Sequence, residues 1–293
     1  MPKKLAAHLS VLSLNLLYVF SYFIVKDVSP NHLSASAFVL IRASGATILF
    51  WLVALFFKGT KIEKQDHPKL IFAALFGIVF NQLLFFNGLV LTSSVNTSIL
   101  MTTTPILVLP ISAWLLKEKM TPFKIIGVVV GFLGALLIIL QKESVVSGNN
   151  PALGNILVFI NAALFSFYLV YVKPIMIKYS LFEVLKWLFL YGTIVIIPFG
   201  LSDFLSIDWT TFTPKVWGAV LYVIFGITFL TFILNMYAIK ELSPLAVSIY
   251  IFLQPLLTAI VSWFWINETI SFVGGLASCL IFVGVYFVAI KKS

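Results

Sequence analysis

Hydrophobic positions in this chain are gathered in ten blocks, and most polar positions fall between them. A block of roughly 20 apolar residues is long enough to cross a hydrocarbon core about 30 Å thick as a helix. The blocks lack the strict two-residue alternation of barrel strands, so each one predicts a membrane-spanning helix. The predicted helices are 9–25, 34–57, 69–91, 95–116, 121–140, 153–173, 181–201, 215–239, 243–266 and 272–290.

The composition agrees with an all-α integral membrane protein. Hydrophobic residues make up 61% of the 293 residues, charged residues make up 10%, and the mean hydropathy is +1.10. An ordinary soluble domain has about 45–50% apolar and about 25% charged residues. A signal peptide is the alternative interpretation of the first block, but that run ends at Lys26-Asp27 without a small-residue cleavage site.

The basic residues predict the orientation in the membrane. With ten spans both termini lie on one side, and cytoplasmic loops carry an excess of lysine and arginine. If the N-terminus is cytoplasmic, only Lys26, Lys142 and Lys215 fall in outer loops, and Arg42 and Lys186 fall within helices. The other 14 of the 19 basic residues are then cytoplasmic. We therefore expect both termini in the cytoplasm and a location in the inner (cytoplasmic) membrane. Topology also explains the net charge of +9 better than nucleic-acid binding does.

The second half of the chain repeats the first. A shift of 150 residues aligns Tyr18 with Tyr168, Ser98 with Ser248, Pro105 with Pro255, Glu118 with Glu268, and Gly134 with Gly284. The two units are 1–143 and 151–293, and each contains five predicted helices. An odd number of helices makes the two units enter the membrane from opposite sides. The sequence therefore predicts two inverted five-helix repeats, a construction that many secondary transporters use for alternating access.

Two prolines lie at equivalent positions in the fourth and ninth predicted helices. Pro105 and Pro255 each remove one backbone donor, which frees the carbonyl groups of Met101 and Ile251. A free carbonyl is costly against lipid, so these carbonyls must face protein or water. We expect both helices to be kinked there and to form walls of a central cavity.

Five further features of the chain occur together: the first-helix pattern Tyr18-Val-Phe-Ser-Tyr-Phe-Ile-Val-Lys26, Arg42, the stretch from Asn87 to Ile99, Pro105 with Glu118, and Gly127 to Gly134. In these motifs the chain resembles the EamA-type members of the drug/metabolite transporter superfamily. The resemblance covers nearly the whole chain and implies a ten-helix carrier of small metabolites. The family's first-helix pattern usually begins with tryptophan and glycine, where this chain has Tyr18 and Val19. In the second half, Lys186 stands where the first has Arg42.

Polar and aromatic side chains within the predicted helices are candidates to line a cavity. In the first helix, Asn15, Tyr18 and Tyr22 share one face, and several other helices carry similar stripes. The alternative is that each hydroxyl or amide simply bonds within its own helix or to a neighbour. The candidate substrate-binding residues are Tyr18, Tyr22, Asn81, Gln82, Phe85, Ser98, Thr102, Tyr168, Asn235, Tyr250 and Gln254.

Arg42 and Lys186 are candidate anion contacts. Neither has an evident acidic partner within the membrane, so each could hold a substrate carboxylate or phosphate or could extend to the lipid headgroups. Every glutamate in or beside the blocks falls near a helix end. Proton coupling through a buried carboxylate is therefore not expected, and we predict gradient-driven efflux.

The remaining motifs favour a carrier over its rivals. The three histidines lie at helix ends or in loops and no H-E-x-x-H occurs, so we expect no enzyme. A channel filter or charged ring is not visible. The lone cysteine, Cys279, allows no intramolecular disulfide, and we expect no metal and no cofactor. The predicted protein is a monomeric exporter of small metabolites, with amino acids or related zwitterions as the expected cargo. The alternative cargo is a nucleotide sugar or another phosphorylated metabolite, for which only Arg42 and Lys186 could supply cations.

Overall fold

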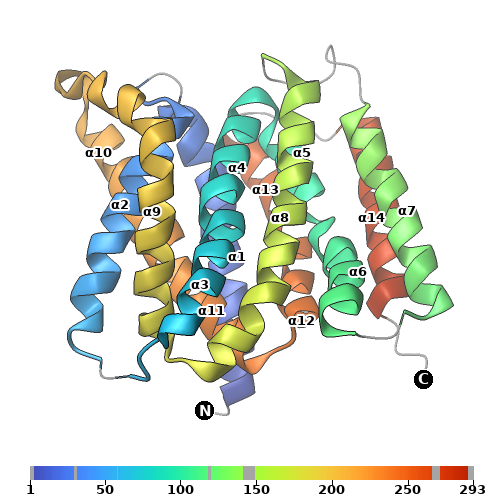
Figure 1. Ribbon diagram of the computed structural model, residues 1–293. Coiled ribbons are helices and arrows are strands. Elements are labelled where there is room, and N and C mark those ends of the chain that lie inside the picture. Colours follow the sequence, from blue (N-terminus) through green and yellow to red (C-terminus); the bar gives the residue numbers. More distant parts are fainter. Residues whose placement is uncertain are drawn as a thin grey trace.

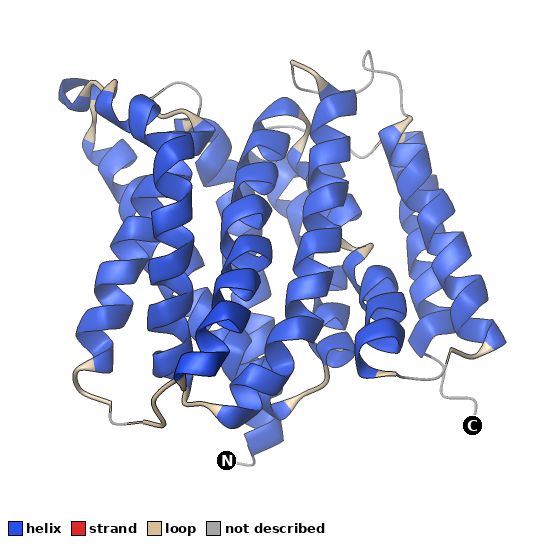
Figure 2. Ribbon diagram, in the orientation of Figure 1, coloured by secondary structure: helices blue, strands red, loops and turns tan. Residues whose placement is uncertain are grey.

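The computed structural model describes residues 3–29, 32–57, 59–117, 120–140, 149–265 and 271–289. Within these ranges every regular element is a helix, and the helices stand roughly side by side as a bundle (Figures 1 and 2). Eight helical segments are long and apolar enough to cross a membrane, and two further apolar helices are shorter. The predicted class, an all-α membrane protein with ten spans, is confirmed. The described residues do not include Glu118, Lys142 and Glu268. They also do not include positions 143 and 293, at which the two predicted repeats end.

The first half of the chain supplies five spans. They begin with α1 (Lys3–Val28) and α2 (Ala35–Ala54). The third span follows the short turn η1 (Lys64–Asp66) and is made of α3 (His67–Ala74), the π-helical segment η2 (Leu75–Val79) and α4 (Phe80–Leu91). The fourth is divided into α5 (Ser94–Met101) and α6 (Thr104–Leu116), and the fifth is α7 (Pro122–Ile139).

The second half has the same organisation. Its first two spans are α8 (Pro151–Lys178) and α9 (Leu181–Leu205), followed by the turn η4 (Trp209–Thr211). The third span is made of α10 (Pro214–Leu221), the π-helical segment η5 (Tyr222–Leu230) and α11 (Thr231–Glu241). The fourth is made of α12 (Pro244–Ile249), η6 (Tyr250–Phe252) and α13 (Leu253–Trp265), and the fifth is α14 (Phe272–Ala289).

Contacts between the halves follow a two-fold pattern. Helix α1, the first span of the first half, packs on α11 in the third span of the second half. In the same way α8, the first span of the second half, packs on α4 in the third span of the first half. The second spans of the two halves, α2 and α9, pack on each other, and so do the fifth spans, α7 and α14. In Figure 1, α1 begins and α14 ends at the same, lower end of the molecule. This arrangement is that of an inverted repeat.

The proline at position 105 divides the fourth span instead of merely bending it. The sequence predicts one helix over 95–116, but α5 ends at Met101 and α6 begins at Thr104. The carbonyl that Pro105 frees, on Met101, accepts a 2.7 Å hydrogen bond from the Thr104 hydroxyl. The ninth span changes at the equivalent place, where the 3-10 turn η6 precedes Pro255. Both freed carbonyls therefore lie where the helix changes its geometry.

The π-helical segments recur in both halves, and each packs on a glycine of the span that crosses it. A Cβ added at Gly45 would lie 2.9 Å from Ile224 in η5, and one added at Gly192 would lie 2.7 Å from Ile78 in η2. Gly45 and Gly192 are thus matching contacts of α2 and α9. The hydrophobic pattern of a π-helical segment does not differ from that of an α-helix. The sequence therefore does not predict these two segments.

Close packing of α7 on α14 leads to a prediction about stability. A Cβ at Gly284 would lie 2.6 Å from the Gly127 carbonyl oxygen, whereas a Cβ at Gly275, on the same helix, meets nothing within 4 Å. We expect Gly284→Ala to push the two helices apart and lower the midpoint of thermal unfolding in detergent. Gly275→Ala is the control, and its better helix propensity should leave the midpoint unchanged or slightly raised. Equal midpoints for the two variants would contradict this account of the packing.

Candidate functional site

A cavity lies at mid-depth between the two halves. It has an empty volume of about 710 Å³, which includes space open to solvent. Its walls come from α1, α2, α4, α5, α8, η5, α11, α12, η6 and α13. The lining residues are Leu14, Asn15, Tyr18, Ser21, Tyr22, Arg42, Asn81, Gln82, Phe85, Phe86, Met101, Asn161, Phe165, Ile227, Phe232, Asn235, Val247, Ser248, Ile251 and Gln254.

The structure brings together most of the residues that the sequence singled out. The candidates in the lining are Tyr18, Tyr22, Asn81, Gln82, Phe85, Asn235, Gln254 and Arg42. Met101 and Ile251, whose carbonyls the prolines free, line it as well. That these candidate residues bind the substrate stays a prediction. Asn15 and Asn161 also line the cavity and belong to polar stripes visible in the sequence, whereas Ser21 and Ser248 had no such signal.

Arg42 is the central charged group of this lining. The residue is only 3% exposed. Its guanidinium donates to Gln82 Oε1 at 2.5 Å, to Thr228 Oγ1 at 2.9 Å and to the Ile227 carbonyl at 3.4 Å. It also lies over the Phe86 ring, 4.7 Å from the centroid. Among the described residues no carboxylate pairs with it, so the positive charge is held by neutral acceptors and an aromatic face.

A second polar network joins the two halves across the cavity. The Tyr22 hydroxyl donates to Gln254 Oε1, and Gln254 Nε2 donates to Asn15 Oδ1 at 2.6 Å. Asn15 in turn donates to the Val11 carbonyl within its own helix at 2.8 Å. Because Tyr22 and Asn15 are on α1 and Gln254 is on α13, this network connects the first repeat to the second. The Tyr22 ring also contacts Phe85 at 5.9 Å between centroids, which extends the aromatic part of the wall.

Asn81 and Asn161 form a third contact between the halves, where α4 crosses α8. Asn161 Nδ2 donates to the Asn81 carbonyl at 2.7 Å, and Asn81 Nδ2 donates to the Asn161 carbonyl at 3.4 Å. Gln82 Nε2 donates to Asn81 Oδ1 at 3.2 Å. The amide groups beside Arg42 are therefore linked to one another and not independently oriented.

Two hydroxyl candidates on the fourth span lie away from the cavity. Ser98 donates to the Val95 carbonyl at 2.7 Å, and Thr102 donates to the Ile99 carbonyl at 2.5 Å. Neither residue is in the lining. Both hydroxyls bond carbonyl groups within α5. Bonding within the helix is the alternative to lining a cavity that the sequence leaves open.

Two tyrosine candidates are also placed away from the cavity. Tyr168 is fully buried, its hydroxyl contacts Met236 Sδ at 3.6 Å, and its ring covers Gly77, where a Cβ would lie 2.3 Å away. Its repeat counterpart Tyr18 lines the cavity, so the halves differ here. Tyr250 is 2.9 Å from His8 Nδ1 and is held against α1 outside the lining.

Lys186 corrects two expectations. It does have an acidic partner, since its ammonium lies 2.7 Å from Glu183 Oε1, and it also lies over the Trp51 ring at 5.2 Å. It is not in the cavity lining. Nor is it the counterpart of Arg42, because the matching contacts of Gly45 and Gly192 place Phe189 at the position equivalent to Arg42. The arginine of one half therefore corresponds to a phenylalanine in the other.

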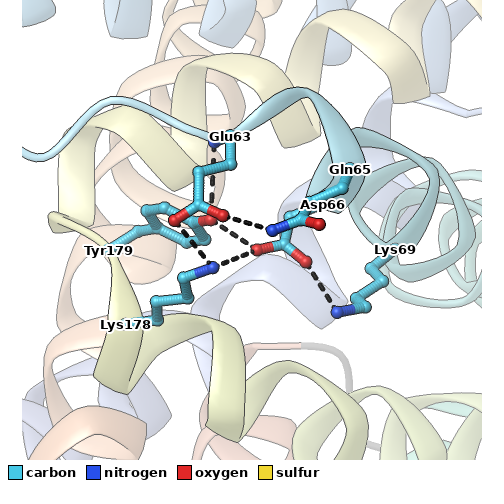
Figure 3. Close-up of polar contacts among 6 residues, drawn as sticks. All are labelled: Glu63, Gln65, Asp66, Lys69, Lys178 and Tyr179. Atoms are coloured by element: carbon cyan, nitrogen blue, oxygen red, sulfur yellow. Dashed lines mark hydrogen bonds and ion pairs between the residues drawn. The ribbon is translucent and has the colours of Figure 1, made fainter.

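A charged cluster joins the halves at the end of the molecule where α1 begins. Figure 3 shows Asp66 between Lys69, Lys178 and Tyr179, with Glu63 and Gln65 beside them. Asp66 is buried, and its carboxylate lies 2.6 Å from the Lys69 ammonium and 2.7 Å from the Lys178 ammonium, while the Tyr179 hydroxyl donates to it. A hydrogen bond from Lys178 holds the pKa of the Glu63 carboxyl below its ordinary value. The cluster fastens α8 to the start of the third span.

The opposite end of the molecule has a weaker ion pair, between the first span of one half and the third span of the other. Lys215, at the start of α10, lies 2.6 Å from Asp27, at the end of α1. Both side chains are mostly exposed, at 76% and 52%. Exposed pairs of this kind contribute little because water already solvates both charges. The buried charged cluster is thus at one end of the bundle, and the exposed ion pair is at the other.

A membrane bundle built from inverted repeats around a central cavity is the construction of many secondary transporters. Comparison with known proteins agrees. The EamA-like transporter family matches residues 5–140 and again residues 152–290. The chain belongs to this family, whose members are transporters and not enzymes.

Several relatives share the whole length of the chain. An uncharacterized transporter of Archaeoglobus fulgidus is 26% identical over 276 residues, covering 94% of this chain and 93% of its own. The uncharacterized transporter YetK of Bacillus subtilis is 26% identical over 90% of this chain and 79% of its own. A crystal structure of a protein aligns with a TM-score of 0.66 at 15% identity and covers 98% of both chains, which supports the fold. These names agree with transport and assign no substrate.

The two ends of the cavity lead to a prediction with a matched control. Asp66→Asn leaves Lys69 and Lys178 without their shared carboxylate, and we expect a clear drop in the midpoint of thermal unfolding. Asp27→Asn removes the exposed pair with Lys215 and should change the midpoint little. Both midpoints can be read from the intrinsic fluorescence of the purified protein. A drop in Asp27→Asn as large as that in Asp66→Asn would contradict the ranking of the two ends.

Proposed function

We propose that this transporter exports amino acids or related zwitterions by alternating access around the central cavity. The observation that carries the proposal is Arg42, a buried cation in the cavity lining that has no carboxylate partner among the described residues. A buried charge needs a partner, and an ionisable residue at membrane depth commonly marks a substrate path. A substrate carboxylate would supply the missing negative charge.

The rest of the lining suits the remainder of such a substrate. Asn81, Gln82, Asn161, Asn235 and Gln254 offer amide donors and acceptors. The rings of Tyr18, Tyr22, Phe85 and Phe86 offer an apolar surface whose faces also attract an ammonium group. One cation, several amides and aromatic rings match a small zwitterion with an organic side chain.

The alternative cargo, a nucleotide sugar or another phosphorylated metabolite, matches less well. Two or more phosphate charges would require several cations, because a single guanidinium cannot neutralise them. Among the described residues that line the cavity, Arg42 is the one lysine or arginine, and Lys186 lies elsewhere, paired with Glu183. The lining therefore favours a substrate with a single carboxylate.

The proposed orientation keeps both termini in the cytoplasm of a cell whose inner membrane holds the protein. The connection from α2 to α3 and the ends of α8 and α11 lie at the end where α1 begins (Figure 1). These segments carry Lys61, Lys64, Lys69, Lys178 and Lys240, which supports this sidedness. The two-fold pattern of helix contacts supports alternating access. Because no aspartate or glutamate occurs among the described lining residues, the proposed driving force is the substrate gradient. We propose that one chain suffices as a monomer.

Transport by purified protein in liposomes tests this function. We expect saturable uptake of one or more amino acids from a labelled panel, and little uptake of nucleotides or sugar phosphates. Arg42→Gln should raise the apparent KM for the amino acid about tenfold to a hundredfold, the effect of losing a charged hydrogen bond. Lys186→Gln is the control and should leave the KM unchanged, because Lys186 lies outside the lining.

The panel also decides between the two cargo classes. Flux of phosphorylated compounds alone would replace the amino-acid proposal by its alternative. Linear, unsaturable flux would indicate a channel in place of a carrier. An unchanged KM in a well-folded Arg42→Gln protein would remove the proposed carboxylate contact.

A further inference from the structure

Thr228 contacts Arg42 without lining the cavity. Arg42 Nε donates to Thr228 Oγ1 at 2.9 Å, yet only Arg42 of the two is in the cavity lining. Thr228 is also only 1% exposed. A substrate in the cavity would therefore meet the guanidinium, and Thr228 can act on that substrate only through Arg42.

The Thr228 hydroxyl is oriented as an acceptor for Arg42. A hydroxyl has one proton, and Thr228 donates its proton to the Val223 carbonyl at 2.6 Å. The lone pairs of Oγ1 are then left for Arg42, which can only donate. The bond to Val223 spans five residues within the π-helical segment η5, whereas a threonine in an α-helix bonds the carbonyl three or four residues back. The local geometry of η5 therefore supplies the partner that orients this hydroxyl.

Close packing of α2 on η5 brings Arg42 to this acceptor. Gly45 lies about one turn after Arg42 on α2, and a Cβ at Gly45 would lie 2.9 Å from Ile224 of η5. The Ile227 carbonyl of η5 accepts a further hydrogen bond from Arg42 Nη2, at 3.4 Å. Two of the three guanidinium nitrogens, Nε and Nη2, are therefore bound to η5.

The third guanidinium nitrogen is bound by the equivalent residue of the other half. Arg42 Nη1 donates to Gln82 Oε1 at 2.5 Å. Ile78 of η2 and Ile224 of η5 make the matching contacts with the glycines of α9 and α2. Gln82 comes four residues after Ile78, and Thr228 comes four residues after Ile224. Both third spans thus present a side-chain oxygen to the same guanidinium.

We propose that Thr228 is a positioning residue, which holds the Arg42 guanidinium in the orientation that binds the substrate carboxylate. This inference rests on the proposed function and makes it more specific. A guanidinium binds a carboxylate best through two parallel hydrogen bonds, so its plane must be aligned with the carboxylate. The acceptors on η5 fix that plane before the substrate arrives, which lowers the entropic cost of binding. Without the Thr228 hydroxyl, the Arg42 side chain is free to take other orientations.

The test compares two inhibitors of amino-acid uptake into liposomes. One is the best-transported amino acid of the labelled panel, and the other is its carboxamide, which lacks the carboxylate. Thr228→Val removes the hydroxyl and keeps the branched shape of the side chain. It should weaken inhibition by the amino acid about threefold to tenfold, the effect of losing one hydrogen bond at the guanidinium, and leave inhibition by the carboxamide nearly unchanged. Thr228→Ser keeps the hydroxyl and should behave as the wild type.

Thr47 provides a matched control on the helix that carries Arg42. Its hydroxyl donates to the Ala43 carbonyl at 2.8 Å and lies 2.8 Å from the Thr193 hydroxyl on α9, and it is not in the cavity lining. Thr47→Val therefore removes a threonine hydroxyl between two spans without touching Arg42. It should leave the ratio of the two inhibition constants as in the wild type.

The double variant Arg42→Gln/Thr228→Val tests whether Thr228 acts through Arg42. We expect it to give the same ratio of inhibition constants as Arg42→Gln alone, because two residues that act through one contact are not additive. If Thr228→Val weakens the amino acid as much in the Arg42→Gln background as in the wild type, the positioning role is wrong.

Three further outcomes bear on the proposal. An unchanged ratio in Thr228→Val, or a loss in Thr228→Ser equal to that in Thr228→Val, would overturn the role of the hydroxyl and leave amino-acid transport standing. If Thr228→Val does not fold, Thr228→Ala, which also lacks the hydroxyl, takes its place with the same expected result. If the wild type takes up no amino acid at all, the proposed function and the positioning role fail together.

Discussion

Polar groups inside a membrane protein must find their partners within the protein, and this constraint organises the whole bundle. Arg42 shows it most clearly, because its guanidinium reaches one acceptor on α4 and two on η5, from opposite halves of the chain. The Tyr22–Gln254–Asn15 network and the Asn81–Asn161 pair also cross between the halves. The contacts that satisfy buried polar groups are therefore the same contacts that surround the cavity.

The inverted repeat supplies a nearly symmetric frame, and the residues around the cavity depart from that symmetry. Gly45 of α2 contacts η5, and Gly192 of α9 makes the matching contact with η2. Three residues before these glycines, however, α2 carries Arg42 and α9 carries Phe189. Tyr18 lines the cavity while Tyr168 is folded over Gly77. Two equivalent halves would present the same groups from both sides, whereas here the two sides of the cavity differ.

The ends of the molecule differ in the same way. Asp66 is buried between two lysines and a tyrosine, and Asp27 meets Lys215 in the open. At the end that holds the Asp66 cluster, Lys173 also donates to the carbonyls of Lys240 and Leu242, at 3.0 and 2.6 Å, which ties α8 to the end of α11. The buried ion pairs and the exposed one therefore contribute unequally to holding the two halves together.

The sequence by itself determined the ten spans, the repeat and the positions of Pro105 and Pro255, because bilayer thickness sets helix length and proline removes a backbone donor wherever it occurs. Helical spacing also identified most of the polar residues in the cavity lining. Only the tertiary structure decided which candidates lie outside the cavity lining, namely Ser98, Thr102, Tyr168, Tyr250 and Lys186. It also decided that Lys178 and Tyr179 bind the Asp66 carboxylate. Spacing tells which residues share a face of a helix. Which way that face points depends on neighbours far away in the sequence, such as Gly77 beneath Tyr168.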